Sequence, residues 1–263
     1  MWVESFDPLR FPRAACSFGW IEMDSGQIAK FPSAARGHSR RAHRLLLNKT
    51  ILVVMGALAV AFAGVDLAAQ SIPTTVNFAK DGVGSPPTGF EFERTGNGDL
   101  GRWTVINDPT ATTGFAIEHF STDQHEDRFP LAIYTSARME NAEISARFKI
   151  IQGRMLAAGI AVCVRNPGDY YAVIASALEH RVDLFLFRGG KITRIEGAEA
   201  DVAQGKWHLL GVAVQDDHFA VSLDQRLLFT AFDRARIKDG KAALLTQEDN
   251  ITRFDLMQIW RVE

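Results

Sequence analysis

The clearest pattern in the chain is an alternation of apolar and polar positions within residues 206–233. Phe219 and Val221 alternate with small or polar side chains, which is the period-two pattern of a strand with one buried face. The pairs Asp216-Asp217 and Asp224-Gln225 interrupt this pattern with the short polar breaks that reverse a chain. The stretch therefore predicts three consecutive antiparallel strands.

Strand-like runs of the same kind recur from residue 89 almost to the end of the chain. Turn-forming residues separate most of them, as at Asn107-Asp-Pro109 and Asn166-Pro-Gly168. About a dozen short strands without a long helical pattern indicate an all-β sandwich or barrel. Outside 206–233, the predicted strands are 89–94, 102–107, 115–120, 131–135, 142–151, 157–165, 170–178, 182–188, 192–196, 242–246 and 251–262.

Residues 1–70 have a different character. Five basic residues between Arg36 and Lys49 precede thirteen uncharged residues at 51–63, a length that suits an export signal and is short for a membrane span. We expect an N-terminal extension with a signal peptide or an anchor in 1–70, a Pro/Gly/Ser-rich linker in 71–88 and one domain in 89–263. The predicted location is secreted or periplasmic, with membrane attachment only if the N-terminal segment stays uncleaved.

Charge and cysteine content narrow the function classes. From residue 71 onward the chain has 21 Lys and Arg against 26 Asp and Glu. The resulting net charge of about −5 disfavours nucleic acid as a partner, because phosphate binding needs a basic surface. Cys163 is the one cysteine in this part of the sequence, so an intramolecular disulfide is excluded there, and its apolar surroundings indicate a buried thiol rather than a nucleophile. The oligomeric state stays open.

Three segments resemble a known family: Arg128–Tyr134, Asp169–Glu179 and Gly205–Asp224. They are similar to exported bacterial proteins with a concanavalin A-like lectin/glucanase domain, also described as laminin-G-like and related to the 3-keto-disaccharide hydrolase domain. The resemblance covers about residues 89–262. It implies a jelly roll of two antiparallel sheets, one of them concave, and a role in carbohydrate chemistry.

The chain departs from this family at positions where hydrogen-bonding or sugar-stacking side chains are common. The family commonly has Gly in a hairpin turn where this chain has Gln225. The resemblance therefore implies that a ligand site on the concave face is altered or weakened. Where the family commonly has Arg, Arg, Asn, Trp and Tyr, this chain has Cys163, Ile174, Ser176, Leu245 and Arg253.

Hydrolysis of a glycoside would need two carboxyl groups at a set spacing. Family-sixteen glycosidases carry Glu-x-Asp-x-x-Glu on one strand, which places two carboxyl groups on one face about 5 Å apart, and the sequence lacks this triplet. Glu91 and Glu93 share a face, but we interpret them as a solvated strand edge. The remaining catalytic candidates are His125, Glu126 and Glu179.

Binding of a sugar needs aromatic faces and planar hydrogen-bonding groups. The ligand-binding candidates are Arg128, Arg165, Tyr170 and Glu179. Because Tyr170 and Tyr171 are adjacent on a strand, only one of them can face a concave groove. Trp103, Trp207 and Trp260 all lie in strand runs, and we expect them to be core residues.

Metal binding has little support in the sequence. The histidines after residue 71 lack the His-x-His and His-x-x-x-His spacings that hold transition metals. We predict neither a metal site nor a cofactor, with structural calcium left open because separate loops can supply its oxygen ligands.

Together these patterns favour an exported, carbohydrate-associated, lectin-like binding or accessory domain with a glycan or modified disaccharide as its partner. Two alternatives stay open. One is a hydrolase of the 3-keto-disaccharide or glycosidase type that uses His125, Glu126 or Glu179. The other is a laminin-G-like structural or protein-interaction module.

Overall fold

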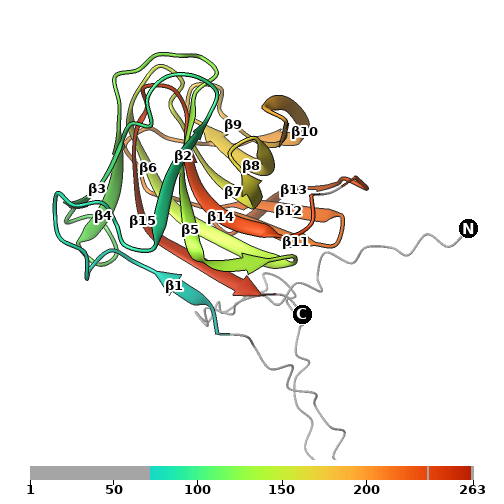
Figure 1. Cartoon of the computed structure of the whole chain (residues 1–263), viewed down its shortest axis with the longest axis horizontal. Helices are drawn as coiled ribbons and strands as arrows, with labels where there is room; N and C mark the ends of the chain where they lie inside the picture. Colours follow the sequence, from blue (N-terminus) through green and yellow to red (C-terminus); the bar gives the residue numbers. More distant parts are fainter. Residues whose placement is uncertain (1–71, 236, 262–263) are drawn as a thin grey trace, which may run out of the picture. The chain divides into compact units, whose positions relative to one another are not determined.

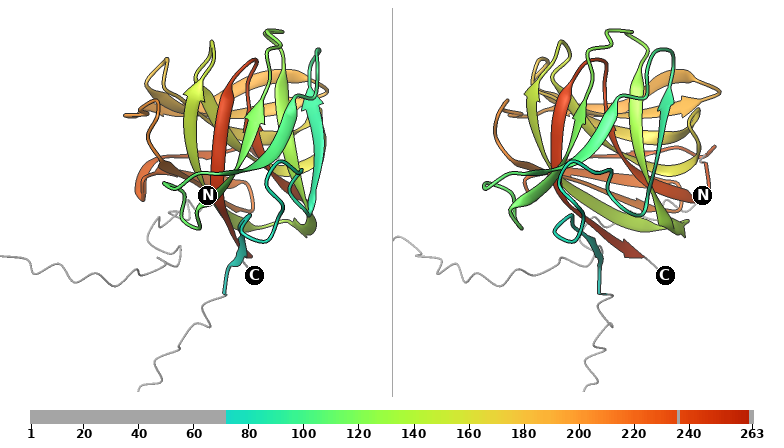
Figure 2. Two further views of the ribbon diagram at one scale, coloured as in Figure 1. Left: turned by 90° about the vertical axis from the view of Figure 1, so that its left-hand side faces the viewer. Right: turned by 60° about the vertical axis from the view of Figure 1, so that its left-hand side comes forward.

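The computed structural model describes residues 72–235 and 237–261, which form two antiparallel β-sheets packed face to face (Figures 1 and 2). The predicted all-β sandwich is confirmed. The eight-stranded sheet has the order β13 (Arg226–Phe232), β12 (His218–Leu223), β11 (His208–Gln215), β6 (Ala142–Gln152), β15 (Ile251–Arg261), β4 (Phe115–Phe120) and β3 (Arg102–Asn107), with β1 (Thr74–Val76) paired to β15. The seven-stranded sheet has the order β10 (Lys191–Glu199), β9 (Arg181–Arg188), β8 (Asp169–Ser176), β7 (Ala157–Asn166), β14 (Gly240–Thr246), β5 (Phe129–Met139) and β2 (Phe90–Thr95).

The core lies between the two sheets and follows the alternation in the sequence. In β6, Ile144 and Phe148 point into the core, whereas Arg147 and Lys149 point to the outer face of the sheet. Full burial of one such large apolar side chain contributes about 1.5–3 kcal/mol. In the described part of the chain, no helix is long and apolar enough to cross a membrane.

The predicted meander in residues 206–233 is confirmed as β11, β12 and β13, which pair in register. Asp224 and Gln225 in its second turn have φ angles of 50° and 66°, as a two-residue type I′ turn requires. These angles are costly without glycine. The Asp224 carboxylate compensates by accepting hydrogen bonds from the backbone N–H of Leu209 and from His208, both at 2.8 Å.

Two features differ from the sequence prediction. The strand β1 lies within residues 71–88, which the sequence predicted to be a linker, and it extends the eight-stranded sheet. Trp103 is buried in the core as predicted. The same prediction was wrong for Trp207 and Trp260, which are half-buried. Trp260 follows the core residue Ile259 and so points to the outer face of β15, while Trp207 precedes the first residue of β11.

Candidate functional site

The outer face of the seven-stranded sheet is strongly concave. The strands β2 and β8 are four strands apart in this sheet, a separation of about 19 Å if the sheet were flat. Yet the hydroxyl groups of Thr95 in β2 and Tyr170 in β8 lie 2.7 Å apart, and the Thr95 hydroxyl also donates a hydrogen bond to the Pro167 carbonyl oxygen. Twist and curvature therefore bring the end of the edge strand β2 into contact with the start of β8 across the concave face.

Aromatic side chains fill the centre of this concave face. The Tyr170 ring stacks on Phe187 with centroids 4.4 Å apart, and the edge of Phe187 meets Phe129 at 5.0 Å. Burial raises the pKa of the Tyr170 hydroxyl above its ordinary value, so the group stays protonated. These rings cover a floor of small and aliphatic side chains that are also buried: Ala161, Ala172, Ala243, Leu131 and Leu245.

The space left at one end of the concave face is a pocket of about 170 Å³, which we call the concave-face pocket. It lies beside the β8–β9 turn (residues 177–180), where the exposed Glu179 forms part of its rim. Among the described residues the Glu179 carboxylate makes no hydrogen bond or ion pair. The pocket is lined by Phe129, Met155, Ala157, Ile174, Ser176, Glu179, Asp183, Phe185, Phe187, Ile192 and Gln247.

Asp183 is the second carboxylate in the concave-face pocket, and both of its oxygen atoms are occupied. Arg181 donates to them from Nε at 2.6 Å and from Nη2 at 2.8 Å, and Arg194 donates from Nε at 2.8 Å. The adjacent strand has Gly197 at this point, where a Cβ atom would lie 1.8 Å from the Asp183 Oδ1 atom. Asp183 therefore joins β9 to β10 and is not free to attack a substrate.

Arg128 holds the loops at this end of the sandwich together. Its side chain is fully buried, and its guanidinium group donates from Nε to the Asp99 carbonyl oxygen at 2.6 Å and from Nη1 to the Glu248 carbonyl oxygen. The Asp123 carboxylate lies 3.8 Å away. Desolvation lowers the pKa of Arg128 from its ordinary value. A residue predicted to bind ligand is thus enclosed by protein and positions the surrounding loops.

The three catalytic candidates do not converge on one site. His125 and Glu126 are exposed in the β4–β5 loop (residues 121–128) and are not among the residues that line the concave-face pocket. His125 Nδ1 lies 2.5 Å from Asp123 Oδ1, with the imidazole side chain 58% exposed. The hydrogen bond from His125 holds the pKa of Asp123 well below its usual range. Glu179 alone of the three lines the pocket.

The ligand-binding candidates are also separated. Arg165 is exposed near the end of β7, before the β7–β8 turn (residues 167–168), whereas Glu179 lies beyond the opposite end of β8. Tyr170 faces the concave side and Tyr171 the core, as their alternation predicted. Tyr170 is fully buried, however, with its hydroxyl group bonded to Thr95.

The residues that depart from the family pattern divide between this face and other places. Ile174 and Ser176 line the concave-face pocket, and Leu245 lies in the floor of the concave face. Cys163 is buried in the core at an irregularity in β7, and Arg253 lies on the other sheet. Ile174 and Leu245 thus contribute apolar surface to the concave face.

Metal ligands do not gather in the described residues. Within 72–235 and 237–261, no group of three or more His, Cys, Asp or Glu side chains is arranged to hold a metal ion. The expectations about cofactors and calcium stay predictions.

Comparison with protein-family models and with curated proteins finds no match. Solved structures do match. Domain 4 of AbnA, a GH43 extracellular arabinanase from Geobacillus stearothermophilus solved in complex with arabinotriose, is 12% identical with a TM-score of 0.51, over 73% of this chain and 93% of that chain. A Bacillus subtilis protein of unknown function with a galectin-like fold is 8% identical with a TM-score of 0.52, over 73% and 97%.

A β-glucanase from Bacillus licheniformis is similar over 72% of this chain and 98% of that chain, with 10% identity and a TM-score of 0.50. Identities this low establish a common fold and nothing finer. The described part of the chain is a concanavalin A-like jelly roll, a fold found in carbohydrate-binding and carbohydrate-hydrolysing domains.

Proposed function

We propose that this chain is an exported, lectin-like domain that holds the end of a saccharide in the concave-face pocket and does not hydrolyse it. The observation that carries the proposal is the pairing of a half-buried phenyl ring, Phe185, with the Glu179 carboxylate, which makes no hydrogen bond within the described residues. Phe185 is half-buried and offers apolar surface to the C–H face of a sugar ring, and it packs against the buried rings of Phe129 and Phe187. Glu179 and Gln247 offer hydrogen-bonding groups to its hydroxyls.

The size of the pocket limits what it holds. Pockets for drug-sized ligands usually measure roughly 300–1,000 Å³, and this one measures about 170 Å³. One sugar unit is therefore the expected occupant, with the rest of a longer saccharide outside. The arabinotriose complex of the arabinanase domain supports a saccharide as the ligand class.

The hydrolase alternative has less support at this pocket. A glycosidase needs two carboxyl groups that are free to act on either side of the scissile bond. Both oxygen atoms of Asp183 accept hydrogen bonds from arginines, which leaves Glu179 as the remaining carboxylate of the lining. A single acid without a partner favours binding over turnover.

Export of the domain rests on the basic and apolar character of residues 36–63. Expression of the full chain in a bacterium with a periplasm tests it. Recovery of the mature domain from the periplasm, with an intact mass that shows loss of about the first 63–70 residues, would support export. Retention of the whole chain in the cytoplasm would contradict it.

A glycan array and a turnover assay on the full chain test the proposed function together. We expect binding to a defined set of neutral saccharides without release of products, including from 3-keto disaccharides. Glu179→Gln should weaken binding by about 10–100-fold, because a hydrogen bond to a charged group contributes about 1.5–3 kcal/mol. Glu126→Gln, which changes an exposed carboxylate outside the pocket, is the matched control and should bind normally.

Turnover of any array saccharide or 3-keto disaccharide would overturn the non-catalytic assignment. Equal loss of binding in Glu126→Gln and Glu179→Gln would overturn the assignment of the site. No binding to any saccharide on the array, together with tight binding to an envelope protein, would favour the protein-interaction alternative instead.

A further inference from the structure

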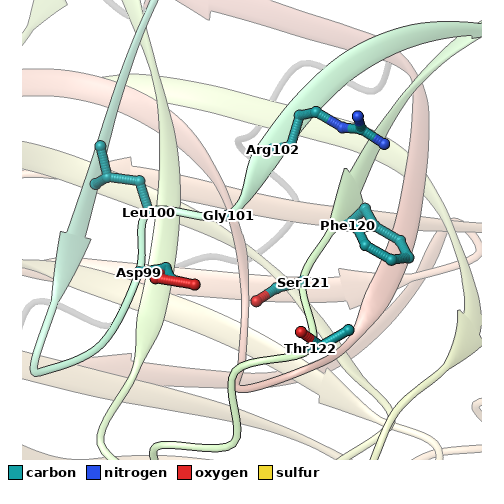
Figure 3. A pocket seen from close by; sticks show the side chains of 7 residues that line it. All are labelled: Asp99, Leu100, Gly101, Arg102, Phe120, Ser121 and Thr122. Carbon is teal, nitrogen blue, oxygen red and sulfur yellow. The ribbon is translucent and has the colours of Figure 1, made fainter.

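A second pocket lies on the eight-stranded sheet, at the open end of the β3–β4 hairpin. It measures about 440 Å³, within the range of roughly 300–1,000 Å³ that is usual for small-molecule sites. We call it the β3–β4 pocket. Its lining residues, shown in Figure 3, are Asp99, Leu100, Gly101, Arg102, Phe120, Ser121 and Thr122.

The side chains of this pocket present an aromatic ring beside polar groups of both charges. Arg102 and Phe120 are a cross-strand pair, with the guanidinium carbon 5.7 Å from the ring centroid, and Phe120 is 39% exposed. Figure 3 shows the Arg102 side chain above the Phe120 ring, Ser121 and Thr122 below it, and Asp99 on the opposite side of the pocket. Among the described residues, the Arg102 guanidinium group and the Asp99 carboxylate make no hydrogen bond or ion pair with another side chain.

The wall of the β3–β4 pocket is held rigidly from behind. The Asp99 N–H donates to Asp123 Oδ2 at 2.6 Å, and the Asp99 carbonyl oxygen accepts from Arg128. Gly101 has a φ of +70°, and a Cβ atom there would lie 2.2 Å from the His119 Nε2 atom. The wall therefore requires glycine, and the pocket is formed before any ligand arrives.

We propose that the β3–β4 pocket is a second saccharide-binding site that takes a neutral sugar unit. The ring of Phe120 receives the apolar face of the sugar, while Arg102 donates to its hydroxyls and Asp99 accepts from them. An anionic group would meet the Asp99 carboxylate, and a cationic group would meet Arg102, so a neutral ligand suits the pair. The ligand class is that of the proposed function, on which this inference rests, whereas the site and its residues are different.

Two sites on one domain suit a polymer better than a free sugar. The concave-face pocket is small and accepts one unit, whereas the β3–β4 pocket is open and wide. Simultaneous contact with one polysaccharide raises the overall affinity above that of either site without any new contact. We therefore expect the domain to bind long chains more tightly than trisaccharides.

Residue-resolved NMR titration of the full chain with arabinotriose and with a β-glucan trisaccharide tests the second site. Saccharide should shift two groups of amide signals, one from residues 99–102 and 120–122 and the other from residues around Glu179. Each group should follow its own binding curve. Phe120→Ala should lower the saccharide affinity obtained from the signals of 99–102 and 120–122 by about tenfold. The affinity obtained from the signals around Glu179 should be unchanged. Phe232→Ala is the matched control, because Phe232 is 57% exposed on the same sheet with the Arg234 guanidinium group 5.8 Å from its ring.

The outcomes separate this inference from the proposed function. Shifts around Glu179 alone would overturn the second site and leave the proposed function standing. Shifts at 99–102 that survive Phe120→Ala, or that Phe232→Ala reduces equally, would also overturn it. Shifts at 99–102 that persist in Glu179→Gln, while the shifts around Glu179 disappear, would support two independent sites. An absence of shifts at millimolar saccharide would contradict both proposals.

Discussion

The two sheets of the sandwich bury their outer faces in opposite ways. On the seven-stranded sheet, curvature closes the concave face over aromatic rings such as Tyr170 and Phe187. On the eight-stranded sheet, the β3–β4 turn (residues 108–114) lies over a network of ion pairs that we call the charged face. The charged face comprises Asp108, Glu118, Arg147, Lys149, Arg253 and Asp255.

The charged face centres on Asp108. Its carboxylate accepts from Lys149 Nζ at 2.6 Å and from Arg253 Nη1 at 3.0 Å. Burial alone would raise the pKa of Asp108, but the hydrogen bonds from Lys149, Thr110 and Arg253 hold it well below its ordinary range. Trp207 covers Lys149, with the ammonium nitrogen 4.6 Å from its ring. Paired charges thus fill the space that aromatic rings fill on the other sheet.

This difference explains where the two pockets lie. Neither face is open at its centre, because side chains of the protein already occupy it. Both pockets are found at the ends of strands, where the aromatic filling or the ionic network stops. Arg128 bonds to Asp99 beside one pocket and to Glu248 beside the other, so both depend on the same buried guanidinium group.

The largest expected effect comes from Arg128→Ala. Loss of the guanidinium group leaves two carbonyl oxygens without their donor and a void in the protein, for a cost of about 4–5 kcal/mol of unfolding free energy. Urea denaturation measures it. Arg128→Lys restores the charge without the two-pronged geometry and should recover only part of the loss. A loss below about 1 kcal/mol for Arg128→Ala would show that the loops do not depend on this residue.

Asp108→Ala should break the charged face at a cost of about 3 kcal/mol, because it leaves the nearly buried Lys149 ammonium group without its carboxylate. The ion pairs of Asp183 with Arg181 and Arg194 on the concave face do not involve Asp108 and should be unchanged in this variant. Thermal unfolding of the wild type and the variant measures this loss of stability. Repeating it at raised salt tests whether the loss persists when exposed charges are screened. Full tolerance of Asp108→Ala would mean that water, rather than the ion pair, satisfies Lys149.

Acid should weaken the fold through His119. Burial lowers its pKa to about 4, below the value of about 6.5 expected in the unfolded chain. The neutral imidazole therefore contributes stability that is present above pH 6.5 and is lost as pH falls towards 4, amounting to about 2 kcal/mol by pH 5. His119→Gln should flatten the stability curve between pH 7 and 5. If the variant loses unfolding free energy with falling pH as the wild type does, other groups cause the acid sensitivity.

Tyr170→Phe isolates the contact that closes the concave face. It removes the hydrogen bond to Thr95 and keeps the stacked ring, so we expect a loss of about 1 kcal/mol with little change in the core. The raised pKa of the Tyr170 hydroxyl also stabilises the fold below pH 10, and this contribution is lost as pH rises above 10. Because burial is the cause of the raised pKa, a wild-type stability curve between pH 9 and 11 that matches the variant would show that the Tyr170 hydroxyl is not buried. Equal stability of the two proteins at pH 7 would show that the contact with Thr95 contributes nothing.

The sequence predicted the fold well because its signal is local. Alternation in β6 and β12 and the turn residues at Asn166-Pro-Gly168 appear within single segments. The short strand β1 was missed because three residues carry too little pattern. Trp207 and Trp260 were assigned to the core because strand membership alone does not indicate which face a side chain occupies.

The candidate sites were less predictable because they depend on contacts between distant strands. Glu179 was identified, and it lines the concave-face pocket. The filling of that face by Phe129, Phe187 and Tyr170 depends on sheet curvature, which one-dimensional alternation does not encode. Pairing β8 with β9 in register would have placed Phe187 beside Tyr170, and this is the signal that was available. The β3–β4 pocket joins Asp99 to Phe120 across a hairpin whose register only the structure supplies.

A crystal structure of the full chain with the best saccharide from the array would test saccharide binding without hydrolysis at this pocket. We expect an intact sugar unit in the concave-face pocket, with a hydroxyl group within hydrogen-bond distance of the Glu179 carboxylate and the ring face against Phe185. A saccharide bound elsewhere with this pocket empty, or cleaved products within it, would contradict the proposed function.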